Sequence, residues 1–312
     1  MRTLGIDTSN YTTSVCVYDS ETGEVVQKKL LLPVKQGEKG LRQSDAVFHH
    51  TARLYPLVQE LFAEVDGGID AIGVSQRPRD AEGSYMPCFL VGENVAKCIG
   101  AVADKPVHGF SHQAGHIAAA LYSSGKMNLI NEKFIAFHIS GGTSEMLLVS
   151  PDIEKDFDVK IIGETLDLNC GQAVDRAGVM MGLSFPCGKE LEKLALACSE
   201  KYNPKVCVKG GNCSLSGLEN QCRKMLDAGE TKENIARYCL DFICKTIEKM
   251  TEFALSEYGR LPLVFAGGVM SNSIIREKIQ SRFGASFAQP EFSCDNAAGV
   301  AILASLKETA NE

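Results

Sequence analysis

Residues 134–149 read FIAFHISGGTSEMLLV, in which two apolar runs flank a polar turn that contains a pair of glycines. Short apolar runs bounded by turn residues are typical of buried β-strands, so we predict strands over residues 134–139 and 145–149. A third strand is expected at residues 159–162, and helical segments follow it. This order of strand, polar turn, strand and strand indicates the sheet at the centre of an α/β unit.

The beginning of the chain has the same order of elements. Residues 3–8 and 14–18 are apolar or β-branched and are separated by a polar turn, and a third strand is expected at about 24–32. The similarity is one of pattern rather than of residue identity, and it indicates a weak internal repeat. We therefore predict an α/β protein of two related lobes with a cleft between them, and rank a single doubly wound sheet second.

We assign residues 1–110 and 296–312 to an N-terminal lobe and residues 111–295 to a C-terminal lobe with a helical insertion at about 188–258. Periodic apolar residues and the turn residues that bound them define the remaining elements. Helices are expected at residues 44–64, 89–103, 170–182, 188–199, 214–227, 232–258, 271–283 and 295–308, and strands at 69–74, 107–110, 263–266 and 286–288.

Composition and charge narrow the classes of function. The chain has 312 residues, 45% of them hydrophobic and 23% charged, as is typical of a globular protein. It has no run of about eighteen apolar residues and no signal-peptide pattern, so we expect no membrane span and a cytoplasmic location. The formal net charge is −7. Because Lys and Arg supply most of the affinity for nucleic-acid phosphates, such an acidic chain is a poor RNA binder without partners.

Twelve cysteines are scattered along the chain without a C-x-x-C pair. This spacing does not indicate a zinc ribbon or a thioredoxin-like motif. In a reducing compartment most of them are expected to be free thiols that pack in the core as small hydrophobic side chains.

Two histidines, His112 and His116, follow a predicted strand and are four residues apart. On a helix this spacing places both imidazoles on one face, about one turn apart. With a carboxylate from elsewhere, such as Asp295 in the late stretch FSCDNAAG, they would form a set suited to Fe, Zn or Mn. The alternative is a pair of histidines on a helix surface.

The glycine pairs are candidate phosphate-binding turns. Ser140, Gly141 and Gly142 follow a strand, and glycines there admit positive φ and leave no Cβ to block a phosphate, although most such pairs are tight hairpins. Gly267 and Gly268 end an apolar strand and precede a helix, which is where open α/β sheets bind nucleotides. In the structural alternative, Ser271 or Asn272 caps that helix.

Carboxylates form a further set of candidates. Asp7 ends a buried strand, where it would position a metal or a water molecule or pair with a nearby hydroxyl group. Asp167 and Asp175 lie on either side of the small-residue stretch that begins the predicted helix at 170–182.

These residues together resemble the threonylcarbamoyl-transferase family of the TsaD type, formerly called O-sialoglycoprotein endopeptidase or glycoprotease. The resemblance runs in order along the whole chain. It covers GIDTS at 5–9, HxxxH at 112–116, SGG at 140–142, GET at 163–165, GQAVD at 171–175, SLSGL at 214–218, AGGVxxN at 266–272 and CDN at 294–296.

The resemblance implies two lobes of the actin-like ATPase and sugar-kinase type. It implies one divalent metal, Fe or Zn, held by His112, His116 and Asp295, with Asp7 and Ser140 as catalytic residues. It also implies that the chain moves a threonylcarbamoyl group from threonylcarbamoyl-adenylate to an adenosine of a tRNA anticodon loop. Helper proteins would present the tRNA, and the chain would form a homodimer or a heterodimer with a related paralogue. The residues implied for the adenylate are Ser140, Gly141, Gly142, Asp175, Gly188, Gly267, Gly268 and Asn272.

The chain departs from the family pattern at four places, and we therefore interpret it as a divergent paralogue. Residues 10–13 read NYTT where the family has Cys-Asp-Glu-Thr, so Tyr11 and Thr12 replace two acidic residues. Residues 77–79 read RPR in place of Gly-Pro-Gly, Thr143 replaces a histidine, and residues 186–188 read PCG in place of Pro-Gly-Gly. These changes leave open a nucleotide-binding paralogue that is weakly active or inactive, or that uses another acceptor.

Two other classes of enzyme fit the sequence less well. A metalloprotease, the older family label, would need a general base within a His-Glu-x-x-His pattern, and neither Gln113 nor Ala114 supplies one. A kinase-like phosphotransferase fits the fold but not the metal ligands, because Mg²⁺ prefers oxygen.

Overall fold

The structure, a computed structural model, describes residues 1–9, 11–33, 41–153 and 156–311. Residue 10 of the departing stretch 10–13 therefore lies outside the described residues. Contacts divide the chain into two units. The first comprises Met1–Ile130, Asp152–Phe157 and Cys294–Glu312, and the second comprises Asn131–Pro151 and Asp158–Ser293. These boundaries differ from the predicted ones, which had placed residues 111–130, 152–157 and 294–295 in the second lobe.

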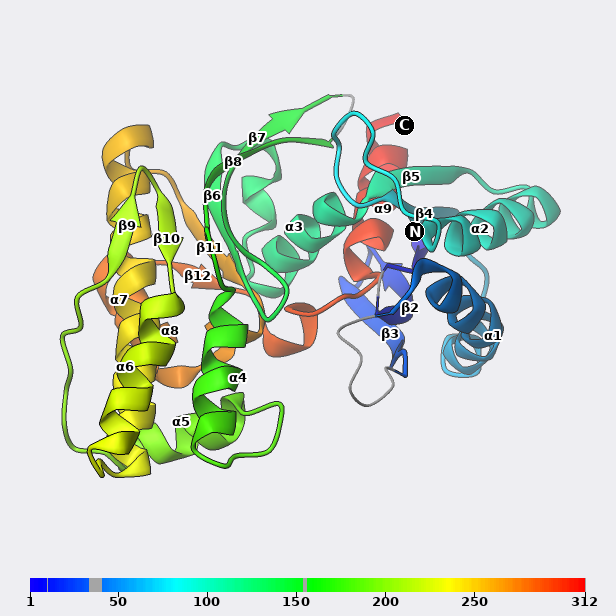
Figure 1. Ribbon diagram of the computed structural model, residues 1–312. Helices are drawn as coiled ribbons and strands as arrows, with labels where there is room; N and C mark the ends of the chain where they lie inside the picture. Colours follow the sequence, from blue (N-terminus) through cyan, green and yellow to red (C-terminus); the bar gives the residue numbers. More distant parts are fainter. Residues whose placement is uncertain (10, 34–40, 154–155, 312) are drawn as a thin grey trace. The chain divides into compact units, whose positions relative to one another are not determined.

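The first unit contains a five-stranded sheet in the order β3-β2-β1-β4-β5 (Figure 1). Strands β1, β2 and β3 are antiparallel neighbours, whereas β4 runs parallel to β1 and β5 runs parallel to β4. The strand bounds are β1 Arg2–Asp7, β2 Thr12–Asp19, β3 Glu24–Leu31, β4 Ala71–Arg77 and β5 Val107–Ser111.

Alternation along β1 decides which side chains meet the helices. Leu4 and Ile6 are fully buried in a cluster with apolar residues of α1 (Gln43–Phe62) and α2 (Phe89–Ala103). Thr3 points to the other face, where its hydroxyl donates to Ala301 O of α9 (Ala298–Asn311) at 2.8 Å. Because strand side chains alternate with a period of two, Asp7 lies on the same face as Thr3.

Helix α3 (His112–Ser123) packs against α9 in the first unit. A Cβ added at Gly299 would lie 1.8 Å from Gly115 O, so the two backbones approach more closely than any side chain would allow. This contact explains why α3 belongs to the first unit and not to the predicted C-terminal lobe. It also brings the residues just before α9 toward the first turns of α3.

The second unit contains its own five-stranded sheet, in the order β12-β11-β6-β7-β8. Three successive strands followed by two later ones give the same order in both sheets, as the repeat predicts. The presence of two sheets excludes the second-ranked fold, a single doubly wound sheet. The bounds are β6 Phe134–Ile139, β7 Ser144–Asp152, β8 Asp156–Glu164, β11 Leu263–Ala266 and β12 Ser286–Phe287.

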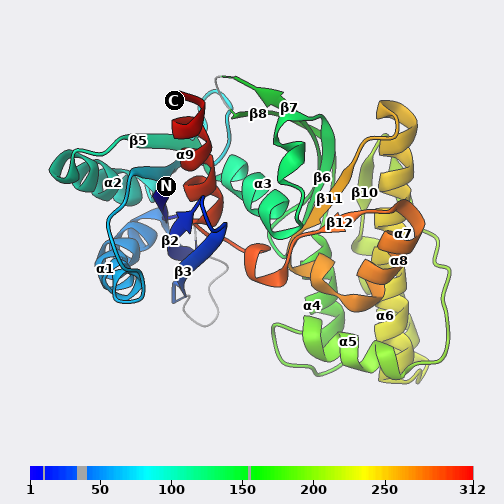
Figure 2. The ribbon, with the colours of Figure 1, turned by 180° about the vertical axis from the view of Figure 1, so that it is seen from behind.

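Five helices complete the second unit around one apolar core. Stacked rings of Phe137, Phe265 and Phe287 cross β6, β11 and β12, with centroids 4.4 and 5.3 Å apart. Helices α7 and α8 lie side by side in both ribbon views (Figures 1 and 2). Within the described residues, no helix has the length and apolar character needed to cross a membrane. The helices are α4 Cys170–Met180, α5 Gly188–Ala197, α6 Ser216–Asp227, α7 Lys232–Tyr258 and α8 Ser273–Phe283.

Local capping explains the main differences from the predicted elements. Helix α8 begins at Ser273 rather than at 271, because the Asn272 side chain caps it and a short 3₁₀ turn, η2 (Gly268–Ser271), precedes it. Helix α9 begins at Ala298 rather than at 295, because Asn296 Oδ1 accepts from Ala298 N at 3.1 Å. The short antiparallel pair β9 (Cys207–Lys209) and β10 (Asn212–Ser214) was not predicted.

All twelve cysteines are free thiols, and nine of them are buried. This confirms the interpretation of most cysteines as core residues. Burial raises the pKa of the Cys170 thiol to about 12, so it is protonated and unreactive at neutral pH. The exposed thiols are Cys98, Cys207 and Cys294.

Candidate functional site

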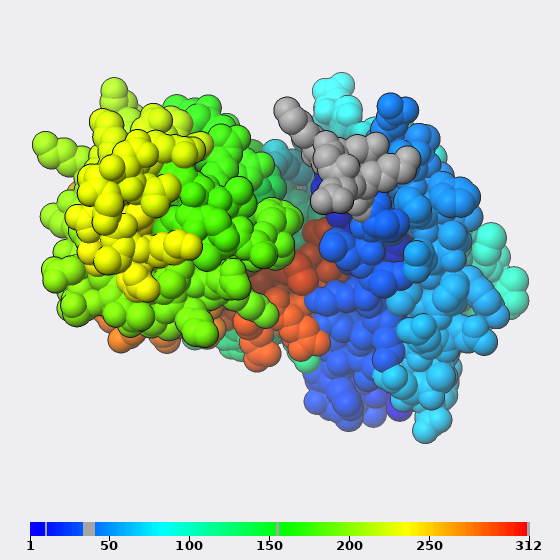
Figure 3. Space-filling model, turned by 60° about the horizontal axis from the view of Figure 1, so that its bottom comes forward, coloured from blue at the N-terminus to red at the C-terminus, as the bar shows by residue number. Residues whose placement is uncertain are grey.

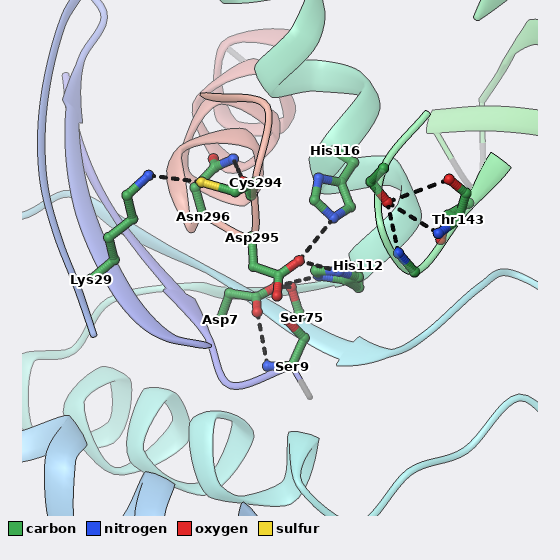
Figure 4. A network of polar contacts seen from close by, with 12 residues as sticks. Asp7, Ser9, Lys29, Ser75, His112, His116, Thr143, Cys294, Asp295 and Asn296 are labelled. Carbon is green, nitrogen blue, oxygen red and sulfur yellow. Dashed lines mark hydrogen bonds and ion pairs between the residues drawn. The ribbon is translucent and has the colours of Figure 1, made fainter. Parts of the chain in front are cut away.

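The two histidines and the late aspartate predicted as metal ligands converge in the first unit. His112 is the first residue of α3, His116 lies one turn later, and Asp295 lies just before α9. Figure 4 shows both imidazoles directed at the Asp295 carboxylate. His112 Nε2 lies 3.6 Å and His116 Nε2 3.4 Å from Asp295 Oδ1, and one ligand atom from each residue lies within 4.8 Å of the others. Two imidazoles and one carboxylate form a ligand set that suits a transition-metal ion with open positions.

Asp7 contacts His112 from the side away from Asp295. Its Oδ2 lies 2.8 Å from His112 Nδ1 and also accepts from the Ser75 hydroxyl, and its Oδ1 accepts from Ser9 N at 2.8 Å. A carboxylate can only accept, so His112 Nδ1 carries a proton and Nε2 is directed toward Asp295 (Figure 4). This is how proteins usually orient a metal-binding histidine.

The carboxylates of Asp7 and Asp295 favour positive charge beside them. Burial would raise the pKa of Asp7, but the charge and hydrogen bond of His112 lower it, so the carboxylate is ionised. Burial would lower the pKa of His112, but the charge of Asp7 and the hydrogen bond with Asp295 raise it to about 10. Burial likewise opposes the charge of Asp295, whereas hydrogen bonds from His112 and His116 hold its pKa well below the usual range. Two ionised carboxylates thus stabilise positive charge at the His112 imidazole.

The first glycine turn lies in the second unit, between β6 and β7. Ser140 Oγ accepts from Gly142 N at 3.3 Å and from Thr143 N at 3.0 Å, so these two amides are directed at one point. Neither Gly141 nor Gly142 has positive φ, so the turn does not use the backbone freedom that glycine admits. A Cβ at either glycine would have no atom within 4 Å, so the turn is open to a ligand. The hydroxyl of Ser140, a predicted catalytic residue, is bonded within the turn.

The second glycine pair lies at the same edge of the sheet as the first. Strands β6 and β11 are parallel neighbours, and Ala266 pairs with His138, so both chains leave the sheet at this edge. Gly267 has φ of 102°, and a Cβ there would lie 2.2 Å from Ile139 O, so this position requires glycine. Gly268 is open. The two turns therefore form one edge at the carboxyl ends of neighbouring strands, as nucleotide sites in α/β sheets do.

The remaining predicted nucleotide residues lie at helix ends of the second unit. Asn272 Oδ1 caps α8 by accepting from Ile275 N at 3.2 Å, as the structural alternative predicts. Asp175 Oδ1 accepts from Cys187 N at 2.8 Å, which brings Asp175 to the start of α5 at Gly188. Burial raises the pKa of Asp175, although this hydrogen bond opposes the change. Helix α4, which carries Asp175, contacts η2 beside Gly268.

A polar pocket of about 310 Å³ adjoins the first glycine turn. The carboxyl groups of Glu145, Glu164 and Asp167 line this pocket. Their negative charge disfavours a phosphate inside the pocket and favours a ligand that donates hydrogen bonds. The lining residues are Gly142, Thr143, Ser144, Glu145, Glu164, Thr165, Leu166, Asp167 and Asn169.

The two sets of candidate residues occupy corresponding places in the two sheets. Asp7 and Ser75 lie near the ends of β1 and β4, and Ser140 and Gly267 follow β6 and β11, which have the same positions in the second sheet. Sequence reasoning missed Ser75, Ser9, Asp80 and Ser111. The available signal was the position of Ser111 directly before the histidine pair, since a serine is a typical N-cap if a helix begins there.

Sequence comparisons place the chain beside a known group of enzymes. A family model for TsaD, tRNA N6-adenosine threonylcarbamoyltransferase, matches residues 33–302. A tRNA N6-adenosine threonylcarbamoyltransferase of Herminiimonas arsenicoxydans is 30% identical over 329 residues, covering 98% of this chain and 92% of the relative. The enzyme of the same name from Archaeoglobus fulgidus is 28% identical, with 96% and 90% covered.

Solved structures resemble the fold at low sequence identity. Component A of (R)-2-hydroxyglutaryl-CoA dehydratase from Acidaminococcus fermentans covers 99% of both chains with a TM-score of 0.57 and 14% identity. The match to full-length HypF spans all of this chain and 56% of the HypF chain, with a TM-score of 0.58 and 13% identity. A ROK family glucokinase from Streptomyces griseus covers 98% and 100%, with a TM-score of 0.51 and 12% identity. These likenesses confirm the predicted actin-like ATPase and sugar-kinase fold.

Proposed function

The chain belongs to the tRNA N6-adenosine threonylcarbamoyltransferase family, and on that basis we propose that it transfers threonylcarbamoyl from threonylcarbamoyl-adenylate to an anticodon-loop adenosine of tRNA. The observation that carries the proposal is the convergence of His112, His116 and Asp295 on one point. In the reaction, the adenosine amine would attack the carbamoyl carbon while the bond to the phosphate oxygen breaks. AMP would leave, and the amine would lose a proton.

We assign the metal to these three ligands and propose Fe or Zn. A bound ion of this kind would supply Lewis acidity toward the carbamoyl or phosphate oxygens of the substrate. Asp7 is 1% exposed and both of its oxygens are occupied, so we propose that it orients His112 and does not touch the substrate. This role replaces the catalytic role that the resemblance implies for Asp7.

We propose that the glycine turns of the second unit bind the adenylate. The amides of Gly142 and Thr143 already converge on one oxygen, Ser140 Oγ, and a phosphate oxygen could take its place. Ser140 would then hold the turn ready and release the two amides when the adenylate binds. Gly268, Asp175, Gly188 and Asn272 are proposed contacts of the adenosine part.

Replacing Gly142 with alanine is expected to weaken AMP binding roughly tenfold or more. The added Cβ would block the approach of the phosphate to the turn, which costs about the free energy of one hydrogen bond. The fold should not change, because the added Cβ would have no protein atom within 4 Å. Calorimetric titration with AMP, beside thermal unfolding, measures both effects. Gly217→Ala is the matched control, since Gly217 is equally open and lies in α6. Equal AMP affinity in the two variants would exclude the turn as the phosphate site.

The transferase activity is tested by reconstitution. We expect N6-threonylcarbamoyladenosine when the chain is mixed with tRNA, ATP, threonine, bicarbonate, an adenylate-forming enzyme and authentic helper proteins. The same mixture with His112→Ala should give none. Absence of product with the wild-type chain would exclude the transferase activity.

The alternative is a nucleotide-binding paralogue that is weakly active or inactive, or that acts on another acceptor. The observation that favours it is the loss of acidic side chains at Tyr11 and Thr12 and of a histidine at Thr143. In that case AMP binding would persist in His112→Ala and cells would tolerate the substitution. The reconstitution separates the two functions, because only the transferase modifies the tRNA.

We propose that the chain acts in the cytoplasm and reaches tRNA through helper proteins, one of them a second copy or a related paralogue. The net charge of −7 supports the need for helpers. Helix α1, light blue at the surface of the first unit in Figure 3, exposes 68% of Phe48 and 71% of Tyr55. The two residues are seven apart in the chain and so lie on the same face of the helix. Aromatic side chains are enriched at protein interfaces.

A further inference from the structure

The loop between β4 and α2 is tied to the first turn of α3, where His112 lies. Asp80 joins the two segments. Its Oδ1 accepts from Arg77 Nε at 2.8 Å and from Arg77 Nη2 at 2.5 Å, and its Oδ2 accepts from Ser111 Oγ at 2.5 Å. The Asp80 side chain is 12% exposed, so these hydrogen bonds are shielded from water. We propose that Asp80 is a positioning residue that holds α3, and through α3 both imidazoles, in the geometry that binds the metal.

Ser111 links Asp80 to the backbone of α3 through two hydrogen bonds. Its hydroxyl donates to Asp80 and accepts from Ala114 N at 3.2 Å, which makes Ser111 the N-cap of α3. Pro78 O accepts from Gln113 N at 3.0 Å. The first amides of a helix have no hydrogen-bond partner within the helix. Pro78 O and Ser111 Oγ accept from two of these amides and so stabilise the first turn against fraying.

A β-bulge places Arg77 where it can take part. Ser75 pairs with Phe110, but the next pair is Arg77 with Ser111, so Gln76 is an extra residue in β4. The bulge brings Arg77 beside the residue that caps α3. Residues 77–79 are also where this chain departs from the Gly-Pro-Gly turn of the family, and a glycine could not supply the guanidinium that fixes Asp80.

Fraying of this turn would affect the metal site before any other part of the first unit. His112 is the first helical residue of α3 and His116 is one turn further on, so the start of the helix sets the distance between their Nε2 atoms and Asp295. Asp7 orients the His112 ring, and Asp80 would fix the backbone that carries it. This inference rests on the metal-binding role proposed for His112, His116 and Asp295.

The test compares Asp80→Ala, Ser111→Ala and the double variant with Asp19→Ala. Asp19 forms another Arg–Asp pair of the first unit, with Arg2 Nε at 3.1 Å, and its hydrogen bonds join Arg2 and Glu21 rather than α3, so it controls for loss of a carboxylate. Zn²⁺ affinity is measured by competition with a chromophoric chelator, and Co²⁺ binding by its visible spectrum. Each single variant should bind Zn²⁺ about tenfold more weakly, as removal of outer-shell partners commonly does. The double variant should be little worse, because both substitutions break one link.

Two further measurements make every outcome decisive. Hydrogen exchange of the metal-free protein should be faster at the amides of Gln113 and Ala114 in Asp80→Ala but not in Asp19→Ala. If Asp80→Ala does not fold, Asp80→Asn, which keeps the side-chain volume, should show a smaller loss of Zn²⁺ affinity. Zn²⁺ affinity and Co²⁺ spectra equal to those of Asp19→Ala would overturn the proposal. If the wild-type chain bound neither metal, the proposed function would fail, and unchanged exchange at α3 would overturn this inference separately.

Discussion

Replacing His116 with alanine is expected to weaken metal binding by roughly 100-fold or more and to abolish transfer of threonylcarbamoyl to tRNA. Loss of an outer-shell partner alone commonly costs about 10- to 100-fold in metal affinity, and His116 is a proposed direct ligand. Its Nε2 lies 3.4 Å from Asp295 Oδ1, within the group whose ligand atoms are all within 4.8 Å of one another. With alanine, only His112 and Asp295 would remain.

Metal content by mass spectrometry and Zn²⁺ affinity by chelator competition measure this effect. His49→Ala is the matched control, because His49 is an imidazole of the same unit that lies on α1 against Phe48. The control should retain both metal and activity. An active His116→Ala protein that has lost its metal would show that the reaction does not need the ion, and a variant that keeps the metal would exclude His116 as a ligand.

The ligands of this centre could be predicted from the sequence, but their supporting residues could not. Two residues four apart on a helix lie on the same face, so His112 and His116 could be recognised as a pair of candidate ligands. Asp295 could be named as a candidate carboxylate, but its position beside the histidines could not be derived, because the contact of Gly115 with Gly299 that brings α9 to α3 leaves no pattern in the sequence. Asp80 and Ser75 were missed for the same reason, since a bulge and a hydroxyl–carboxylate contact depend on tertiary structure.

The fold shows the same division between local and long-range information. Strands such as β6 and β11, and helix α2, match their predicted bounds because their apolar patterns end at clear turn residues. Helix α9 was predicted to start at residue 295, but the Asn296 side chain forms a turn with Ala298 N, and the helix begins at Ala298. The observed division into units differs from the predicted lobes because it depends on the packing of α3 on α9 and not on any break in composition.

Replacing Asp241 with alanine is expected to destabilise the second unit by about 3–5 kcal/mol, the usual cost of removing one partner from a buried ion pair. The Asp241 side chain is 1% exposed and joins α7 to α8. Its Oδ2 accepts from Arg237 Nε at 3.1 Å and from Tyr202 N at 2.9 Å, and its Oδ1 lies 2.5 Å from Lys278 Nζ. Alanine would remove the acceptor for all three donors and leave the Arg237 charge, only 12% exposed, without this carboxylate.

Urea unfolding gives the change in free energy, and hydrogen exchange of peptides from α7 and α8 locates it. Glu252→Ala is the matched control on α7, since Glu252 pairs with Lys249 and Arg282 but is 32% exposed, and an exposed pair contributes about 0–1 kcal/mol. If both variants unfolded alike, the Asp241 contacts would contribute no more than surface pairs. Zn²⁺ affinity should remain that of the wild type in Asp241→Ala, because all three proposed ligands belong to the first unit. His116→Ala should show the reverse, a lost ion with α7 and α8 as protected as before, so the pair of variants separates the chemistry of one unit from the stability of the other.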